Sequence, residues 1–257
     1  MFKINDKEIK NVDDLKEIVE KDISILTEFK YKYEVIKTDV RTYNIYMYVC
    51  MYGTSEMLKY LETHFSNIKC FKDEKNTDLY LIASSSGNLE VMKYLEKEHN
   101  WNIHTRNDYG YDVYLYASYY GHLNIMKYLE KEHNWDIYSK KNYGDDAYLC
   151  ASLGEQLEIM KYLEKEHNWN IKVETILGDN AYLYASRYGY LEIMKYLEKE
   201  HNWDIHIKNN KELDAYYYAK IRKNNEIIKH LENKMFYEKI SKCLNEFLES
   251  NNFLEKS

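Results

Sequence analysis

Four histidines recur at a fixed interval of 34 residues, each between a glutamate and an asparagine, and such a pattern could bind metal ions. They are His99, His133, His167 and His201. Imidazole and carboxylate groups are common zinc ligands, and the ligands of one zinc ion all lie about 2 Å from it. Equivalent positions of stacked repeats are separated by about one helix diameter, roughly 10 Å. We therefore expect no shared metal ion and no cofactor, and we interpret the histidines as helix C-terminal residues facing the helix dipole.

The sequence shows no pattern typical of a catalytic site. It has no nucleophile elbow with a Ser-His-Asp order and no glycine-rich phosphate loop. The repeated Glu-Lys-Glu segments are explained by solvation and by pairing of charges four residues apart on an exposed helix face. The sequence therefore predicts a protein that is not an enzyme.

The histidines belong to a longer repeated unit, which must position them. The nine residues Lys-Tyr-Leu-Glu-Lys-Glu-His-Asn-Trp occur four times and end at Trp101, Trp135, Trp169 and Trp203. A strict period of this length indicates one supersecondary unit copied along the chain, as in a solenoid. Since the tryptophans are identical in all four copies, we expect them to pack between repeats. The copies begin near Asn44, Asp78, Asp112, Asp146, Asn180 and Asp214.

Each copy predicts a short helix, a turn, a longer helix and a loop. In one copy Asp112 is an expected N-cap, because a short acceptor side chain can bind the free N–H groups of a first helical turn. Gly121 separates the two helices, and the apolar residues between Leu123 and Leu129 cover more than half of the second helix. Asn134 suits a left-handed C-cap.

This unit resembles the ankyrin repeat. Ala117-Ser-Tyr-Tyr-Gly121-His122 matches the middle of the family pattern, and Leu123-Asn-Ile-Met-Lys-Tyr-Leu129 matches its second helix. The usual Thr-Pro-Leu-His opening is lost. The tetratricopeptide repeat also has 34 residues, but it lacks a projecting loop and places its Trp and Pro elsewhere. The resemblance implies an all-α solenoid of about six helix-turn-helix repeats, similar to the proline-poor arrays of giant DNA viruses.

Three segments are expected along the chain. Residues 1–43 are an N-terminal cap or a decayed repeat, residues 44–232 are the ankyrin repeats, and residues 233–257 form a C-terminal capping helix that covers the apolar face of the last repeat.

Composition excludes several classes of function. A net charge of -7 argues against nucleic-acid binding, which normally uses a basic surface. No segment is apolar enough for a signal peptide or a membrane span. The scattered cysteines, Cys50, Cys70, Cys150 and Cys243, fit isolated thiols in the cytoplasm or the nucleus. We expect a monomer. The 29 tyrosines and the absence of proline also fit an AT-rich genome, so codon bias and selection for binding remain alternative explanations.

The function predicted is binding of a protein partner, of unknown identity, on the concave face. The copies agree in the second helix and differ in the loop and the outer face of the first helix, which the resemblance to ankyrin repeats assigns to the binding surface. Tyr and Arg are frequent among interface hot spots. The alternatives are an adaptor of a ubiquitin ligase, docking through residues 233–257, and a self-assembling structural repeat protein. The candidate partner-binding residues are Arg106, Asp108, Tyr109, Tyr111, Tyr119, Tyr120, Lys140, Asn142, Tyr143, Asp145, Leu153, Glu174, Ile176, Leu177, Asp179, Arg187 and Tyr188.

Overall fold

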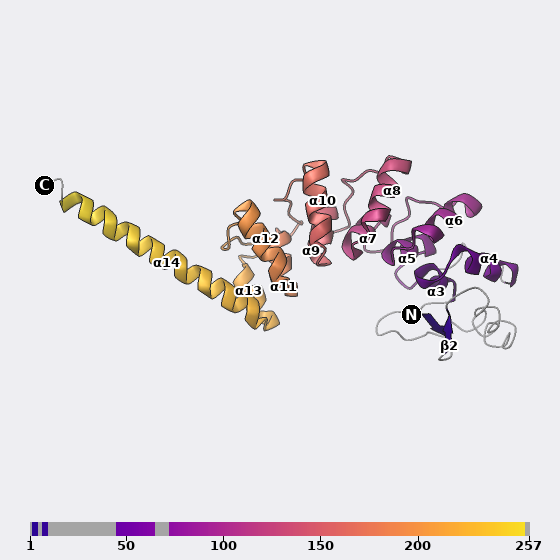
Figure 1. Ribbon diagram of the computed structural model, residues 1–257, viewed down its shortest axis with the longest axis horizontal. Helices are drawn as coiled ribbons and strands as arrows, with labels where there is room; N and C mark the ends of the chain where they lie inside the picture. The colour runs from indigo at the N-terminus through magenta and orange to yellow at the C-terminus, as the bar shows by residue number, and fades with distance from the viewer. Residues whose placement is uncertain (1, 5–6, 10–44, 65–71, 255–257) are drawn as a thin grey trace. The chain divides into compact units, whose positions relative to one another are not determined.

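A computed structural model describes residues 2–4, 7–9, 45–64 and 72–254 of the chain (Figure 1). The chain divides into two compact units, Met1–Trp169 and Asn170–Ser257, which are described separately below.

The first unit contains four helix pairs. They are α3 (Ile45–Tyr52) with α4 (Ser55–His64), α5 (Leu79–Ser85) with α6 (Leu89–His99), α7 (Val113–Tyr120) with α8 (Leu123–His133), and α9 (Ala147–Leu153) with α10 (Leu157–His167). Two strands of three residues each, β1 (Phe2–Ile4) and β2 (Lys7–Ile9), pair antiparallel. The sequence did not predict this strand pair. The remainder of residues 1–43, expected to be a cap or decayed repeat, lies outside the described residues.

The second unit contains two further helix pairs. They are α11 (Ala181–Tyr188) with α12 (Leu191–His201), and α13 (Ala215–Arg222) with α14 (Asn225–Leu254). Together with the first unit this gives six helix pairs among the described residues, so the predicted all-α array of six helix-turn-helix repeats is confirmed.

Polar side chains fix the helix ends as predicted. The Asp112 carboxylate accepts hydrogen bonds from the backbone N–H groups of Tyr114 and Leu115 at 3.1 and 3.0 Å. Gly121 ends the first helix with φ 82°, and Asn134 ends the second with φ 47°, both in the left-handed region that Gly and Asn adopt most easily. Asp or Asn N-caps of the first helix recur at Asp78, Asp146, Asn180 and Asp214, and left-handed Asn C-caps of the second helix recur at Asn100, Asn168 and Asn202. Asn44 lies outside the described residues.

The fourth repeat departs from this turn. Its glycine comes one residue early, so Glu155 takes the left-handed conformation, with φ 64°. A Cβ atom on Gly154 would clash with the backbone carbonyl of Tyr119, which explains the displaced glycine. The turn therefore combines one strained residue with one position where no side chain fits.

The first helices of the repeats form the centre of the core. Tyr80, Tyr114, Tyr148 and Tyr182, at equivalent positions, are fully buried. The repeated tryptophans are 7–9% exposed, which confirms that they are packing residues. In the first unit Trp135 stacks on His104, and Trp169 stacks on Tyr138, at ring-centroid distances of 4.9 and 5.0 Å.

The C-terminal segment differs from the predicted capping helix. Residues 233–254 continue α14 without a break, so the second helix of the last repeat and the expected cap are one helix of 30 residues. Phe236 and the apolar residues after it, as far as Leu248, are exposed. They therefore do not cover the last repeat, as the sequence had suggested.

Candidate protein-binding surface

The repeated histidines are structural. His133 is the last residue of α8, as predicted, but its Nε2 atom lies 3.0 Å from a carboxylate oxygen of Glu96 in the preceding repeat. Glu96 also accepts hydrogen bonds from the hydroxyl groups of Tyr80 at 2.5 Å and Tyr128 at 2.7 Å. His99 and His167 pair in the same way with Glu62 and Glu130. The glutamate of the repeated segment therefore connects neighbouring repeats and does not only solvate a helix. Among the described residues no cluster of His, Cys, Asp or Glu could hold a metal ion.

Four of the described loops are each held by one short polar side chain, at Asp73, Asn107, Thr175 or Asn209. The Asn107 side-chain oxygen accepts hydrogen bonds from the backbone N–H groups of Tyr109 and Tyr111, at 3.1 and 3.0 Å. Thr175 and Asn209 occupy the equivalent position in later loops and bind two backbone N–H groups in the same way. Some residues of the variable loop therefore stabilise the loop conformation and are not free to vary for binding.

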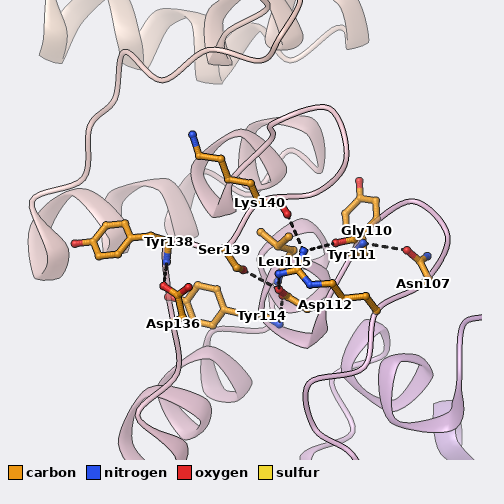
Figure 2. A network of polar contacts seen from close by, with 11 residues as sticks. Asn107, Gly110, Tyr111, Asp112, Tyr114, Leu115, Asp136, Tyr138, Ser139 and Lys140 are labelled. Carbon is orange, nitrogen blue, oxygen red and sulfur yellow. Dashed lines mark hydrogen bonds and ion pairs between the residues drawn. The ribbon is translucent and has the colours of Figure 1, made fainter.

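The candidate residue Arg106 also has a structural role. Its guanidinium donates to the Asp112 carboxylate at 2.8 Å and to the backbone carbonyl of Lys140 in the next loop at 2.7 Å. Figure 2 shows Asp112 at the centre of this network, with the hydroxyl of Ser139 donating to the same carboxylate at 2.7 Å. Arg106 therefore connects a helix N-cap to the following repeat, and its side chain is only partly available to a partner.

Neighbouring loop tips form a hydrogen-bonded ladder. The Asn142 side chain donates to the backbone carbonyl of Asp108 at 2.8 Å, and the Asp108 backbone N–H donates to the carbonyl of Lys75 at 3.0 Å. Asn210 makes the same contacts with Ile176 and Leu177 in the second unit. This ladder fixes the spacing of the tips, and it uses the two candidate residues Asp108 and Asn142.

Five of the predicted tyrosines lie together in the first unit, around an open hollow of about 330 Å³. Its lining consists of Tyr109, Tyr111, Tyr116, Tyr119, Tyr120, Lys141 and Tyr143. We call this set the tyrosine hollow. Tyr143 is 65% exposed and Tyr109 is 46% exposed, so the rim of the hollow consists of accessible aromatic rings.

The floor of the tyrosine hollow consists of rings packed against one another and carries one cation. Tyr111 stacks on Tyr116 at a centroid distance of 4.9 Å and meets the edge of Tyr119 at 6.2 Å. The Lys141 amine donates to the Tyr111 hydroxyl at 3.0 Å and lies 4.7 Å from the centroid of its ring. Burial raises the pKa of Tyr111 above its ordinary value, so its hydroxyl stays neutral.

Lys141 and Tyr116 belong to the hollow but were missed from the sequence. Lys141 stands where other loops have the bridging Asp73, Asn107, Thr175 or Asn209. A lysine has no acceptor atom and cannot bridge the loop, and its amine contacts Tyr111 and Asp145 instead. Comparison of the five copies at this position would have identified Lys141, because it is the residue without an acceptor atom.

Two predicted site residues are buried, which contradicts their assignment to a contact surface. Asp145 is 1% exposed and lies 3.4 Å from the Lys141 amine. Asp179 is 5% exposed and accepts hydrogen bonds from Asn209 at 2.7 Å and Tyr218 at 3.1 Å. Asp145 pairs with a cation of its own loop and Asp179 accepts from donors of the next repeat, so neither buried carboxylate is available to a partner. Arg187, Leu153, Tyr111 and Tyr119 are half-buried, and the other candidates are exposed.

In the second unit, Arg187 and Tyr188 lie in a basic hollow of about 500 Å³. The guanidinium groups of Arg187 and Arg222 lie 5.8 and 5.9 Å from the centroid of the Tyr188 ring. Lys223 adds a third cation to the lining. Ile176 and Leu177, at a loop tip of the same unit, are 68% and 43% exposed, as expected from the sequence.

The repeat geometry defines an α-helical repeat solenoid, and comparison with known families agrees. A family model described as ankyrin repeats in three copies matches residues 46–141, 79–175 and 114–209. These matches span more than half of the chain, which therefore belongs to the ankyrin-repeat family. Ankyrin repeats are protein–protein interaction modules and generally have no enzymatic activity.

One similar solved structure is that of the Bd0816 predatory endopeptidase from Bdellovibrio bacteriovorus in complex with the immunity protein Bd3460. The TM-score is 0.54 at 20% sequence identity, and the alignment covers 74% of this chain and 97% of the matched chain. At this identity the likeness shows the fold alone. No curated protein matches the sequence. Within the described residues no helix is long and apolar enough to cross a membrane.

Proposed function

We propose that this ankyrin-repeat module binds a segment of a partner protein at the tyrosine hollow of its first unit. The observation that carries the proposal is the concentration of exposed and half-buried aromatic rings around one open hollow. Large aromatic side chains bury much area with little loss of conformational entropy, and they dominate binding energy in interfaces.

The structure of the hollow favours binding over simple codon bias. A tyrosine excess caused by genome composition alone would distribute rings without regard to position. Here the rings of Tyr111, Tyr116 and Tyr119 pack against one another, so the floor of the hollow is already ordered before a partner arrives. A partner that offers an apolar side chain and a backbone or side-chain acceptor for Lys141 would fit this lining.

Two exposed tyrosines provide a matched test. Tyr143 belongs to the hollow and is 65% exposed, whereas Tyr138 lies outside it and is 63% exposed. A partner is first isolated by affinity purification of the chain from its native cell and identified by mass spectrometry. We expect Tyr143→Ala to weaken binding of that purified partner by about fivefold or more, corresponding to about 1 kcal/mol, and Tyr138→Ala to leave it unchanged. Equal affinities for both variants would refute the assignment of the hollow.

The proposed biological role is a host-interaction adaptor encoded by a large DNA virus, acting in the host cytoplasm or nucleus. The proline-free, Tyr-rich composition supports the origin, and the free Cys50 and Cys150, both buried, support a reducing compartment. The affinity purification also tests this role. Recovery of a ubiquitin-ligase scaffold that depends on residues 233–257 would instead support a ligase adaptor.

A further inference from the structure

The last helix of the protein extends far beyond its repeat. The second helix of the preceding repeat, α12, ends at His201, and the equivalent position in α14 is Met235. Helix α14 continues to Leu254, so 19 residues, about 28 Å at 1.5 Å per residue, have no counterpart in the other copies. Figure 1 shows this helix running on past α13. The extension is therefore an addition to the ankyrin fold.

The apolar side of α14 changes direction where the repeat ends. Ile227 and Leu231, in the first part of the helix, are 0% and 1% exposed and belong to the core of the second unit. Ile240 follows Leu231 by nine residues, which is about two and a half turns at 3.6 residues per turn. Ile240 therefore points to the side opposite the one that packs on the repeats.

Exposed apolar residues continue along this opposite side. They are Phe236, Tyr237, Ile240, Leu244, Phe247 and Leu248, which are 39–67% exposed. We call them the α14 stripe. The polar contacts of the helix lie on its other side, where Lys234 contacts Glu198 at 2.8 Å and Glu238 contacts His206 at 2.8 Å. The stripe thus faces away from the repeats that anchor the helix.

We propose that the α14 stripe pairs with the same stripe of a second copy of the chain, forming an antiparallel two-helix contact. Tyr237, Ile240, Leu244 and Phe247 follow the alternating spacing of three and four residues by which two helices pack along a common seam. This proposal is independent of the tyrosine hollow, and it differs from the monomer expected from the sequence.

The stripe is complementary to itself in the antiparallel direction. When two copies align about the midpoint of the stripe, Ile240 of each lies opposite Leu244 of the other, and Tyr237 lies opposite Phe247. In an antiparallel pair the same flank of each helix meets, so Phe236 of each copy lies at the level of Leu248 of the other. Both layers of the seam are then apolar.

The area is sufficient for a stable dimer. Taking roughly 200 Å² for each large apolar side chain, the exposed fractions of 39–67% correspond to roughly 700 Å² of apolar surface per copy. A standard protein interface buries about 800 Å² per partner. A second copy of the stripe would therefore cover an area typical of a specific complex.

The mass of the full-length chain in solution tests the proposal. Sedimentation equilibrium over a range of concentrations should give twice the chain mass of 31.3 kDa. We expect Leu244→Glu, within the stripe, to give a monomer, and the neighbouring Asn245→Glu, on the opposite side, to leave the dimer intact. Cooperative thermal unfolding of both variants would show that each is folded, and the unfolding temperature of the monomeric variant should not depend on its concentration. A wild-type monomer at every concentration, or a dimer unaffected by Leu244→Glu, would overturn the proposal.

Cys243 tests the direction of the helices. It is exposed and lies next to the stripe, close to its midpoint, whereas Cys50 and Cys150 are buried. In the antiparallel pair the two Cys243 thiols lie on the same flank, so mild oxidation should produce a covalent dimer that Cys243→Ser abolishes. Absence of the covalent product from an otherwise dimeric protein would contradict the antiparallel arrangement.

Discussion

The hydroxyl of Tyr128 donates a 2.7 Å hydrogen bond to the carboxylate of Glu96 in the preceding repeat. Both residues belong to the segment that is copied most faithfully, and Tyr162 contacts Glu130 in the same way at 2.6 Å. One copied pair of residues therefore joins each repeat of the first unit to the next, which gives the array stability through contacts between neighbours.

Loss of Glu96 should destabilise the first unit. Glu96→Ala leaves the hydroxyls of Tyr80 and Tyr128 without their acceptor, and hydrogen bonds to a charged group contribute about 1.5–3 kcal/mol each. We expect the free energy of unfolding, measured by urea denaturation, to fall by about 3 kcal/mol. The control Glu98→Ala, two residues away and with a side chain that is 44% exposed, should change it by less than about 0.5 kcal/mol. Similar losses in both variants would contradict the ladder.

Tryptophan and tyrosine variants should separate folding from binding. Trp135 is 9% exposed and stacks on His104, so Trp135→Ala should leave a cavity and cost about 3–5 kcal/mol of unfolding free energy. Tyr143 is 65% exposed, and its replacement by Ala should change stability by less than about 0.5 kcal/mol. Chemical denaturation of both variants tests the comparison, which fails if Tyr143→Ala is as unstable as Trp135→Ala.

One substitution should stabilise the second unit. In the first unit Trp169 donates to the N-cap Asp146 at 3.2 Å, but the equivalent N-cap in the second unit is Asn180. The side-chain nitrogens of Asn180 and Trp203 are buried and have no hydrogen-bond partner among the described residues. Asn180→Asp would give the indole an acceptor, and we expect about 1 kcal/mol of added stability in thermal or urea unfolding.

The reverse substitution is the control for this prediction. Asp146→Asn should leave the Trp169 indole unpaired and cost about 1–3 kcal/mol. An Asn180→Asp variant no more stable than the parent protein would show that burial of the new carboxylate offsets its hydrogen bond, since burial already raises the pKa of Asp146.

A substitution in the turn of the fourth repeat should also raise the free energy of unfolding. Glu155 has φ 64°, a conformation that costs a residue with a side chain roughly 1 kcal/mol relative to glycine. We expect Glu155→Gly to raise the unfolding free energy by up to about 1 kcal/mol. Gly154→Ala should lower it strongly, because the new Cβ would clash with the Tyr119 carbonyl. If both variants shift the unfolding midpoint in the same direction, this account of the turn is wrong.

The stability of the second unit should fall in acid because of Glu198. Burial raises the pKa of this carboxyl, but hydrogen bonds from Lys234, Tyr182 and His230 outweigh burial and hold the pKa below its ordinary value. The stabilisation is therefore fully present above the unfolded pKa, about 4.3, and is lost as the pH falls through the lower folded value.

Thermal unfolding measured as the pH is lowered from about 6 to 3, through this pKa range, tests the effect. Glu198→Gln should weaken the dependence on pH, whereas Glu200→Gln, at a half-exposed neighbouring position, should retain it. An unchanged pH dependence in Glu198→Gln would exclude this carboxylate as the cause.

The copied residues made the local structure predictable. The 34-residue interval, the Asp and Asn N-caps and the left-handed Asn C-caps depend on contacts within a few residues, and all of them were confirmed where the structure describes them. Comparison of the copies also identified five tyrosines that meet around one hollow. Variation among copies, however, did not distinguish residues that hold a loop from residues that face solvent, so Asp145 and Asp179 were misassigned.

The period, the repeat family and the packing role of the tryptophans followed from the sequence, because each rests on residues repeated at fixed spacing. The tertiary structure decided which polar side chains make contacts between repeats, since the Glu96–His133 pair joins residues 37 positions apart. The tertiary structure also decided whether the C-terminal apolar residues cover the last repeat. The apolar residues after Met235 have the same helical period whether they fold back or project, and only the direction of α14 shows that they face away from the repeats.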